Sequence, residues 1–175
     1  MKNPLLLTII SIIFYLSVIL TFLVYSTHVD VAWYLHAADI WLDGGTLFKD
    51  VVDMNPPGII FLSTPAAYLA SVLHSSSAFL FYIQTYILAA LLYFYTYRNL
   101  KVPAPARPVI LITLALLLFV TPGYEFGQRE YYVFILVLPY LLQHLSHISH
   151  EEVPRTHLLL SGTLLGLAII IKPHY

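Results

Sequence analysis

The feature that most constrains the fold is an apolar segment from Leu5 to Tyr25 that contains no charged residue. Its length of about 21 residues is enough to cross a bilayer upright, for which roughly 20 are needed. A cleaved secretion signal is the alternative, because Lys2 precedes the segment. The segment exceeds the roughly 7 to 15 apolar residues of a signal peptide and lacks a small-x-small cleavage site. We therefore predict an uncleaved membrane helix.

Five more apolar runs follow, at 58–73, 78–97, 108–121, 131–143 and 158–171. The chain is 59% hydrophobic and 10% charged, with a mean hydropathy of +0.82, whereas about a quarter of the residues in soluble domains are charged. We predict an all-α integral membrane protein, a multi-span helical bundle in which residues 1–175 form a single transmembrane domain. Because the sequence stops as an apolar run ends, we expect it to be the N-terminal portion of a larger membrane domain.

Charge and motif content exclude several functions. The formal net charge of −1 gives no basic excess for nucleic acid, so no nucleic-acid partner is expected. Cysteine is absent, which removes disulfides and thiolate metal sites. The sequence contains no Walker loop, dinucleotide-binding glycine pattern or nucleophile elbow.

The run 58–73 decides the topology. It is about 16 residues long, follows Pro56-Pro57 and contains Pro65, so an interfacial or re-entrant helix suits it better than a span. Five spans then remain, and the basic loop "RNLKVPAPARP" falls on the same side as Lys2, as the accumulation of Lys and Arg in cytoplasmic loops requires. If 58–73 spans instead, this bias reverses. The favoured topology is a multi-pass inner-membrane protein with its active face on the non-cytoplasmic side.

Three polar segments share that outer face: "HVDVAWYLHAADIWLDGGTLFKDVVDMNPPG", "TPGYEFGQREYY" and "KPHY". In the first, apolar residues recur at helical spacing and form one stripe: Val31, Tyr34, Leu35, Ala38, Trp41 and Leu42. Thr27 and Asp30 resemble a capping box, and Gly44-Gly45 is a stop signal. We predict an amphipathic helix over about 30–43 that lies in the interface, with Trp33, Tyr34 and Trp41 at headgroup depth.

Asp30 is not explained by amphipathicity. It stands where the first span leaves the bilayer, and one interpretation is a charge that stabilises a helix N-terminus. The segment "DVVDMNPPG" follows outside the membrane and presents Asp53 and Asn55 before two prolines, either as a plain turn or as a site for a polar headgroup.

Together these segments resemble the C-type (GT-C) membrane glycosyltransferases, and among them the protein-mannosyltransferase and aminoarabinose-transferase family. The resemblance is carried by an acid after the first span with Tyr four residues later, and by the segments "GG", "DVVDMNPPG", "FGQREYYVFILVLPYLL" and "IIIKPHY". The resemblance implies an inverting sugar transferase that uses a polyprenyl-phosphate-linked sugar, with Asp30 as the catalytic base and Asp53 and Glu130 matching acids of the family. Val31 departs from the acid expected after Asp30, and Asn55 stands where aminoarabinose enzymes have lysine.

The chemistry assigns roles to the remaining polar residues. A carboxylate at the lipid boundary serves as a base for the acceptor hydroxyl, and the leaving phosphate needs cations. Arg129 and Lys172 are candidates for the phosphate, with Gln128 beside them. The alternatives are a self-paired Arg129 and Glu130 at a helix start, and a Lys172 that snorkels at a span end.

No cofactor is predicted with certainty. His144, His147 and His150 with Glu151 suggest a metal site, but they fall on the inner face, so a solvated helix end is favoured. A divalent ion at Asp30, Asp53 and Glu130 is an open alternative, although no decisive ligand spacing supports it.

The function predicted from the sequence is transfer of a sugar from a polyprenyl-phosphate lipid to a glycan, lipid or protein acceptor at the outer face of the bilayer. The alternatives are a transporter fragment and a small non-catalytic membrane subunit. A transporter predicts ionisable residues at mid-span, whereas nearly all charges here flank the apolar runs.

Overall fold

A computed structural model describes residues 4–24, 26–52, 56–99, 102–148 and 154–172, with the side chains of 142–148 excepted. All regular elements within these ranges are helical, apart from one isolated bridge between Leu47 and Val51. The elements are α1 (Pro4–Ile19), the π-helical η1 (Leu20–Val24), α2 (Val29–Leu42), α3 (Gly58–Leu73), α4 (Ser77–Asn99), α5 (Ala106–Phe119), the 3-10 turn η2 (Gly123–Glu125), α6 (Arg129–Ile148) and α7 (Arg155–Ile171).

The helices coincide with the apolar runs, and prolines stand at several helix starts. Pro57, Pro105 and Pro154 directly precede α3, α5 and α7, where a missing N–H costs nothing because the first turn of a helix has no acceptor for it. His74, with a φ of 49°, ends α3. The prediction that the described chain is all-helical is confirmed.

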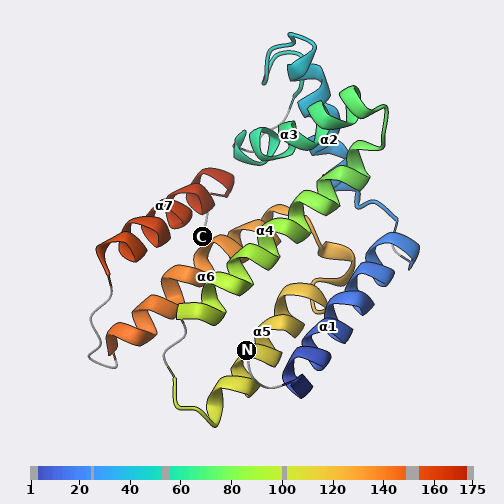
Figure 1. The fold of residues 1–175 in the computed structure, drawn as a ribbon. Helices are drawn as coiled ribbons and strands as arrows, with labels where there is room; N and C mark the ends of the chain where they lie inside the picture. Colours follow the sequence, from blue (N-terminus) through green and yellow to red (C-terminus); the bar gives the residue numbers. More distant parts are fainter. Residues whose placement is uncertain (1–3, 25, 53–55, 100–101, 149–153, 173–175) are drawn as a thin grey trace.

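The long helices run side by side and alternate in direction (Figure 1). The neighbours in this arrangement are α1 with α5, α5 with α4, α4 with α6, and α6 with α7. The end of α1, the start of α4, the end of α5, the start of α6 and the end of α7 therefore lie toward one end of the bundle, where α2 and α3 pack on each other. We call it the α2–α3 end.

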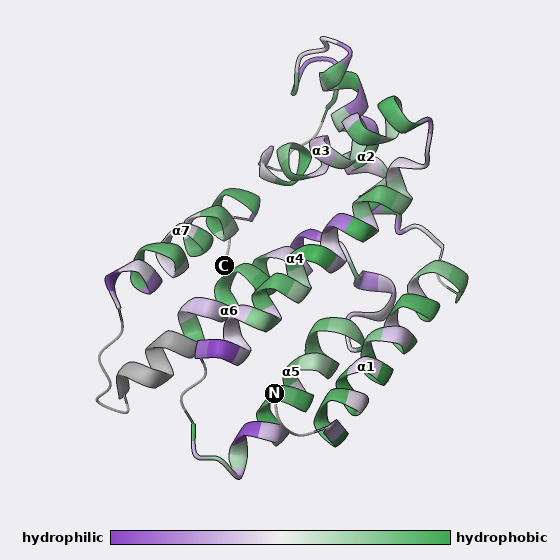
Figure 2. Cartoon of the chain, viewed as in Figure 1, coloured by the Kyte–Doolittle hydropathy of each residue, from purple (hydrophilic) through white to green (hydrophobic). Residues whose placement is uncertain are grey.

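Among the residues that the structure describes, two helical segments are long and apolar enough to cross a membrane by length and composition: Pro4–Val24 and Ser77–Asn99. The apolar helices α3, α5 and α7 are shorter than 18 residues. Apolar residues dominate the lengths of α1, α5 and α7, and hydrophilic residues concentrate near helix ends and in the connections (Figure 2). The structure thus agrees with membrane association, while the five-span topology stays a prediction.

The predicted helix over about 30–43 is confirmed as α2, but most of its apolar stripe is covered by protein. Val31, Leu35 and Ala38 are buried, and Tyr34 is only 1% exposed, because α3 and α4 pack on this face. Tyr34 therefore packs against protein and does not contact lipid headgroups, and its depth in the bilayer stays a prediction. Trp41 is 40% exposed and lies against Phe61 of α3, with 5.1 Å between ring centroids.

Buried hydroxyl groups hold α1 to α4. The Tyr86 hydroxyl lies 2.7 Å from Ser17 Oγ and 2.8 Å from Thr21 Oγ1, so these buried polar groups satisfy one another. Residues 17 and 21 flank the point where α1 becomes π-helical. This contact fixes the last turns of α1, from which the chain leads to Asp30.

A close approach joins α3 to the end of α7. A Cβ on Gly58 would lie 2.7 Å from the Ile170 carbonyl oxygen, a separation that side chains do not tolerate. Glycine at the start of α3 therefore lets the two backbones meet, and it brings α3 beside the helix that carries Lys172.

Candidate functional site

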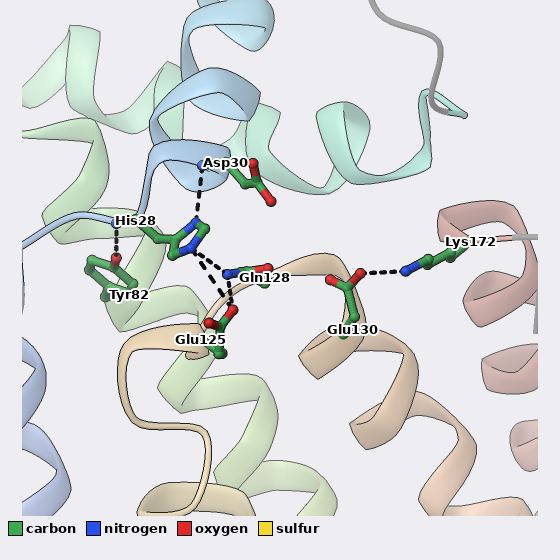
Figure 3. A network of polar contacts seen from close by, with 7 residues as sticks. All are labelled: His28, Asp30, Tyr82, Glu125, Gln128, Glu130 and Lys172. Carbon is green, nitrogen blue, oxygen red and sulfur yellow. Dashed lines mark hydrogen bonds and ion pairs between the residues drawn. The ribbon is translucent and has the colours of Figure 1, made fainter.

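Polar side chains from separate segments gather at the α2–α3 end of the bundle. We call the following residues the junction cluster: His28, Asp30, Glu125, Gln128, Arg129, Glu130 and Lys172. Figure 3 shows all of them except Arg129, with one set of contacts around His28 and a separate ion pair between Glu130 and Lys172. They come from the α1–α2 connection, the start of α2, the turn before α6, the start of α6 and the end of α7.

The turn before α6 places the centre of the cluster. Gly127 has a φ of 90°, and a Cβ there would lie 3.2 Å from the Phe81 ring and 3.3 Å from the Tyr82 ring. Glycine is therefore required both for the backbone conformation and for the close packing against α4. As a result Gln128 is only 6% exposed, and α6 begins next to α2.

Asp30 lies in the first turn of α2, and His28 is the N-cap of this helix. The His28 Nδ1 accepts a hydrogen bond from the backbone N–H of Asp30 at 3.1 Å. The predicted capping box that begins at Thr27 is thus wrong, because the cap is one residue later and uses an imidazole. In Figure 3 the Asp30 carboxylate lies on the side of α2 that faces the segment carrying Gln128 and Glu130.

Tyr34 and Arg129 form the buried contact between α2 and α6. The guanidinium carbon lies 5.7 Å from the Tyr34 ring centroid, a cation–π distance. Neither the Tyr34 hydroxyl nor Arg129 Nε has a hydrogen-bond partner of good geometry among the described residues. Burial raises the pKa of the Tyr34 hydroxyl well above its ordinary value, and the positive charge of Arg129 opposes this only in part. Tyr34 is therefore neutral at physiological pH.

Glu130 forms an ion pair with Lys172, which connects the start of α6 to the end of α7. The Glu130 side chain is 43% exposed and that of Lys172 is 22% exposed. Burial by itself raises the pKa of the Glu130 carboxyl, but the hydrogen bond and charge of Lys172 outweigh it, so the net pKa is lowered. Self-pairing of Arg129 with Glu130, one of the alternatives from the sequence, is not what the structure shows, since Arg129 packs on Tyr34 instead.

The structure brings together Asp30, Gln128, Arg129, Glu130 and Lys172, the predicted site residues that it describes. Asp53 and Asn55 lie outside the described residues, as do His150, Glu151 and the side chains of His144 and His147. Within the described part of the chain no three metal-ligating side chains form a group.

Three members of this region were not predicted as site residues: His28, Tyr34 and Glu125. His28 could have been considered from its position two residues before Asp30, since a ring nitrogen there can reach the first free backbone N–H of a helix. Tyr34 belongs to the apolar stripe of α2, and the pattern of this stripe does not show whether its side chains pack against protein or against lipid. No sequence pattern around Glu125 indicates a site residue, because its contact with Gln128 exists only in the folded turn.

An open apolar pocket of about 260 Å³ lies beside the cluster, between the end of α5 and the start of α6. Its lining residues are Leu117, Thr121, Pro122, Glu125, Tyr131 and Phe134. Glu125 belongs to both the pocket and the junction cluster, so an apolar group in the pocket lies close to the polar residues.

No protein-family model, curated protein or solved structure matches this chain. The resemblance to GT-C enzymes therefore stays a prediction, and the proposals below rest on residues of this chain.

Proposed function

We propose that this chain acts in an inverting transfer of a sugar from a polyprenyl-phosphate lipid to an acceptor hydroxyl at the non-cytoplasmic face of the membrane. The acceptor is a glycan, a lipid or a protein. In this proposal α1, α4, α5, α6 and α7 cross the bilayer, and α2 and α3 lie at its outer surface as in the N-terminal part of a GT-C fold.

The observation that carries the proposal is the junction cluster itself. A carboxylate (Asp30), a guanidinium (Arg129) and an ion pair (Glu130 with Lys172) meet at one end of an apolar bundle. Basic residues mark the other end, where Arg98 lies in the last turn of α4 and Arg107 in the first turn of α5. Since Lys and Arg accumulate on the cytoplasmic side, the cluster belongs to the outer side.

The proposed reaction forms a bond between the acceptor oxygen and the anomeric carbon while the bond from that carbon to the phosphate oxygen breaks. Asp30 takes the hydroxyl proton, and the leaving phosphate keeps the electron pair. Tyr34 is a weak base candidate because its hydroxyl stays neutral and protonated. Arg129 is the stronger phosphate ligand, since the charge of Lys172 is offset by Glu130 whereas Arg129 forms no ion pair with a described carboxylate.

A lipid donor also needs a place for its chain. The apolar pocket beside Glu125 has room for a short stretch of hydrocarbon, and it opens next to the cluster that would hold the phosphate. This pairing of an apolar pocket with a charged rim supports a lipid phosphate over a water-soluble sugar nucleotide.

The position of the charges argues against a transporter. Substrate and ion sites of transporters lie near mid-span, but the charged residues in the described part of α1, α4, α5, α6 and α7 stand in the first or last turns of these helices or directly after them. An active site that faces the membrane surface fits this distribution.

Binding of undecaprenyl phosphate to the purified protein in nanodiscs tests the proposal. Arg129→Ala should weaken binding about tenfold or more, as expected for loss of a charge-assisted hydrogen bond. Arg155→Ala is the matched control, because this exposed arginine begins α7 at the opposite end of the bundle, and its affinity should equal that of the wild type. Equal affinities for Arg129→Ala and the wild type would remove Arg129 from the site.

A further inference from the structure

His28 connects more parts of the site than any predicted residue. Its Nδ1 accepts from the Asp30 N–H at 3.1 Å, and its own backbone N–H donates to the Tyr82 hydroxyl of α4 at 3.4 Å. Its ring centroid lies 4.5 Å from that of Tyr124 in η2. Its Nε2 lies 2.7 Å from the side-chain amide of Gln128. His28 thus contacts α2 and the turn that leads into α6 through its ring, and α4 through its backbone N–H (Figure 3).

The cap hydrogen bond fixes the tautomer of this ring. Because Nδ1 accepts from a backbone N–H, it carries no proton, and a neutral imidazole must then carry its proton on Nε2. The Nε2–H points to the Gln128 amide, which accepts only through its oxygen. The structure has the Gln128 amide nitrogen at this position, where it also donates to Glu125. The orientation of a side-chain amide is assigned from its hydrogen-bond network, and the cap bond at Nδ1 favours the amide turned by 180°, so that its oxygen accepts from His28 Nε2–H.

Glu125 permits this arrangement. Its carboxylate lies 3.9 Å from His28 Nε2 and contacts the Gln128 side chain, but it is 64% exposed and can turn toward solvent. Gln128, at 6% exposed, has no such freedom. The bond from His28 to Gln128 is therefore the fixed link, and Glu125 adjusts to it.

We infer that His28 is a positioning residue that couples the start of α2, where Asp30 lies, to the start of α6, where Gln128, Arg129 and Glu130 lie. The ring accepts a hydrogen bond from α2 through Nδ1 and donates one to Gln128 through Nε2–H. These two bonds fix the position of the start of α2 relative to the start of α6. In the proposed reaction this relative position of the two helix starts sets where the Asp30 carboxylate lies relative to Arg129.

Amide hydrogen exchange in nanodiscs tests the coupling without any turnover. His28→Ala should speed exchange at residues 29–32 on the order of fivefold, the factor that corresponds to loss of one N-cap hydrogen bond. His28→Asn should restore slow exchange there, because Asn is a strong N-cap residue, but it is too short to reach Gln128. His36→Ala is the control, since His36 is exposed on α2 and should change nothing at 29–32.

The link to α6 is tested by Gln128→Ala. In the wild-type background this change should speed exchange at 29–32, and in the His28→Asn background it should have no further effect there. Equal effects of Gln128→Ala in both backgrounds would overturn the coupling. A nitrogen-15 spectrum of His28 that shows the proton on Nδ1 would overturn the tautomer and with it the proposal.

The inference rests on the proposed function only through the role of Asp30. Exchange rates and imidazole spectra do not depend on sugar transfer, so they can fail while undecaprenyl phosphate still binds, and they can succeed if it does not.

Discussion

The ion pair between Glu130 and Lys172 predicts a measurable coupling energy between α6 and α7. At 4 Å and an effective dielectric constant of about 20, two unit charges attract by about 4 kcal/mol. Burial raises the pKa of the Glu130 carboxyl and so offsets part of this attraction, and solvent screens more of it because Glu130 is 43% exposed. We expect a net coupling of about 1 kcal/mol, at the upper end of the range for exposed pairs.

A double-mutant cycle of Glu130→Gln and Lys172→Met measures this energy. The free energy of unfolding is obtained by titration with sodium dodecyl sulfate in mixed micelles, followed by circular dichroism. A cycle of Asp43→Asn with Lys172→Met is the control and should give a coupling near zero, because Asp43 is the exposed C-cap of α2.

The pH dependence of the coupling follows from the direction in which the pKa of Glu130 is shifted on folding. The folded-state pKa of the Glu130 carboxyl is below its ordinary value, so the stability that it contributes is present above the unfolded pKa and is lost as the pH falls through the folded pKa. The coupling should be complete at pH 7 and smaller at about pH 3. A coupling below about 0.3 kcal/mol at pH 7, or an equal value at both pH values, would refute the electrostatic assignment.

Three other predictions concern packing and chemistry. Tyr86→Phe removes the hydroxyl that joins α1 to α4 and should lower the free energy of unfolding by about 1 to 2 kcal/mol; an unchanged unfolding midpoint would contradict this. Gly58→Ala should destabilise by about 1 to 3 kcal/mol, because its Cβ meets the Ile170 carbonyl oxygen, whereas Gly166→Ala has open space and should stabilise by up to about 1 kcal/mol through helix propensity. The same sign for both changes would refute the close approach. Asp30→Asn should abolish sugar transfer in membranes while membrane insertion stays intact, and retained transfer would reject Asp30 as the base. Separate single-cysteine variants at positions 30 and 129 should both be labelled from the non-cytoplasmic side.

The helices could be predicted from the sequence because their signals are local. Uncharged apolar runs separated by polar segments define where each helix lies, and prolines such as Pro57 and Pro105 mark starts. The distribution of Arg98 and Arg107 predicted which polar segments share a side. Asp30, Arg129 and Lys172 lie at the same end of the bundle.

The contacts within the site could not be predicted, because each depends on segments far apart in the chain. Glu130 meets Lys172 across 42 positions, and His28 meets Gln128 across 100. Thr27 and His28 are both able to cap α2, and only the folded structure shows that the His28 ring does so. Likewise the burial of Tyr34 could not be predicted from the sequence, since an apolar stripe has the same pattern whether it faces lipid or another helix.

The length of chain between Glu130 and Lys172 has a consequence for biogenesis. At roughly 5 to 20 residues per second, a ribosome needs about 2 to 8 s to add the 42 positions that separate the two residues. The start of α6 leaves the ribosome earlier than Lys172 by this interval, so the Glu130 carboxylate is at first without its lysine partner. In the proposed topology the start of α6 therefore stays near water until α7 is in place, and a delay in synthesis within α7 would prolong the time in which this carboxylate is unpaired.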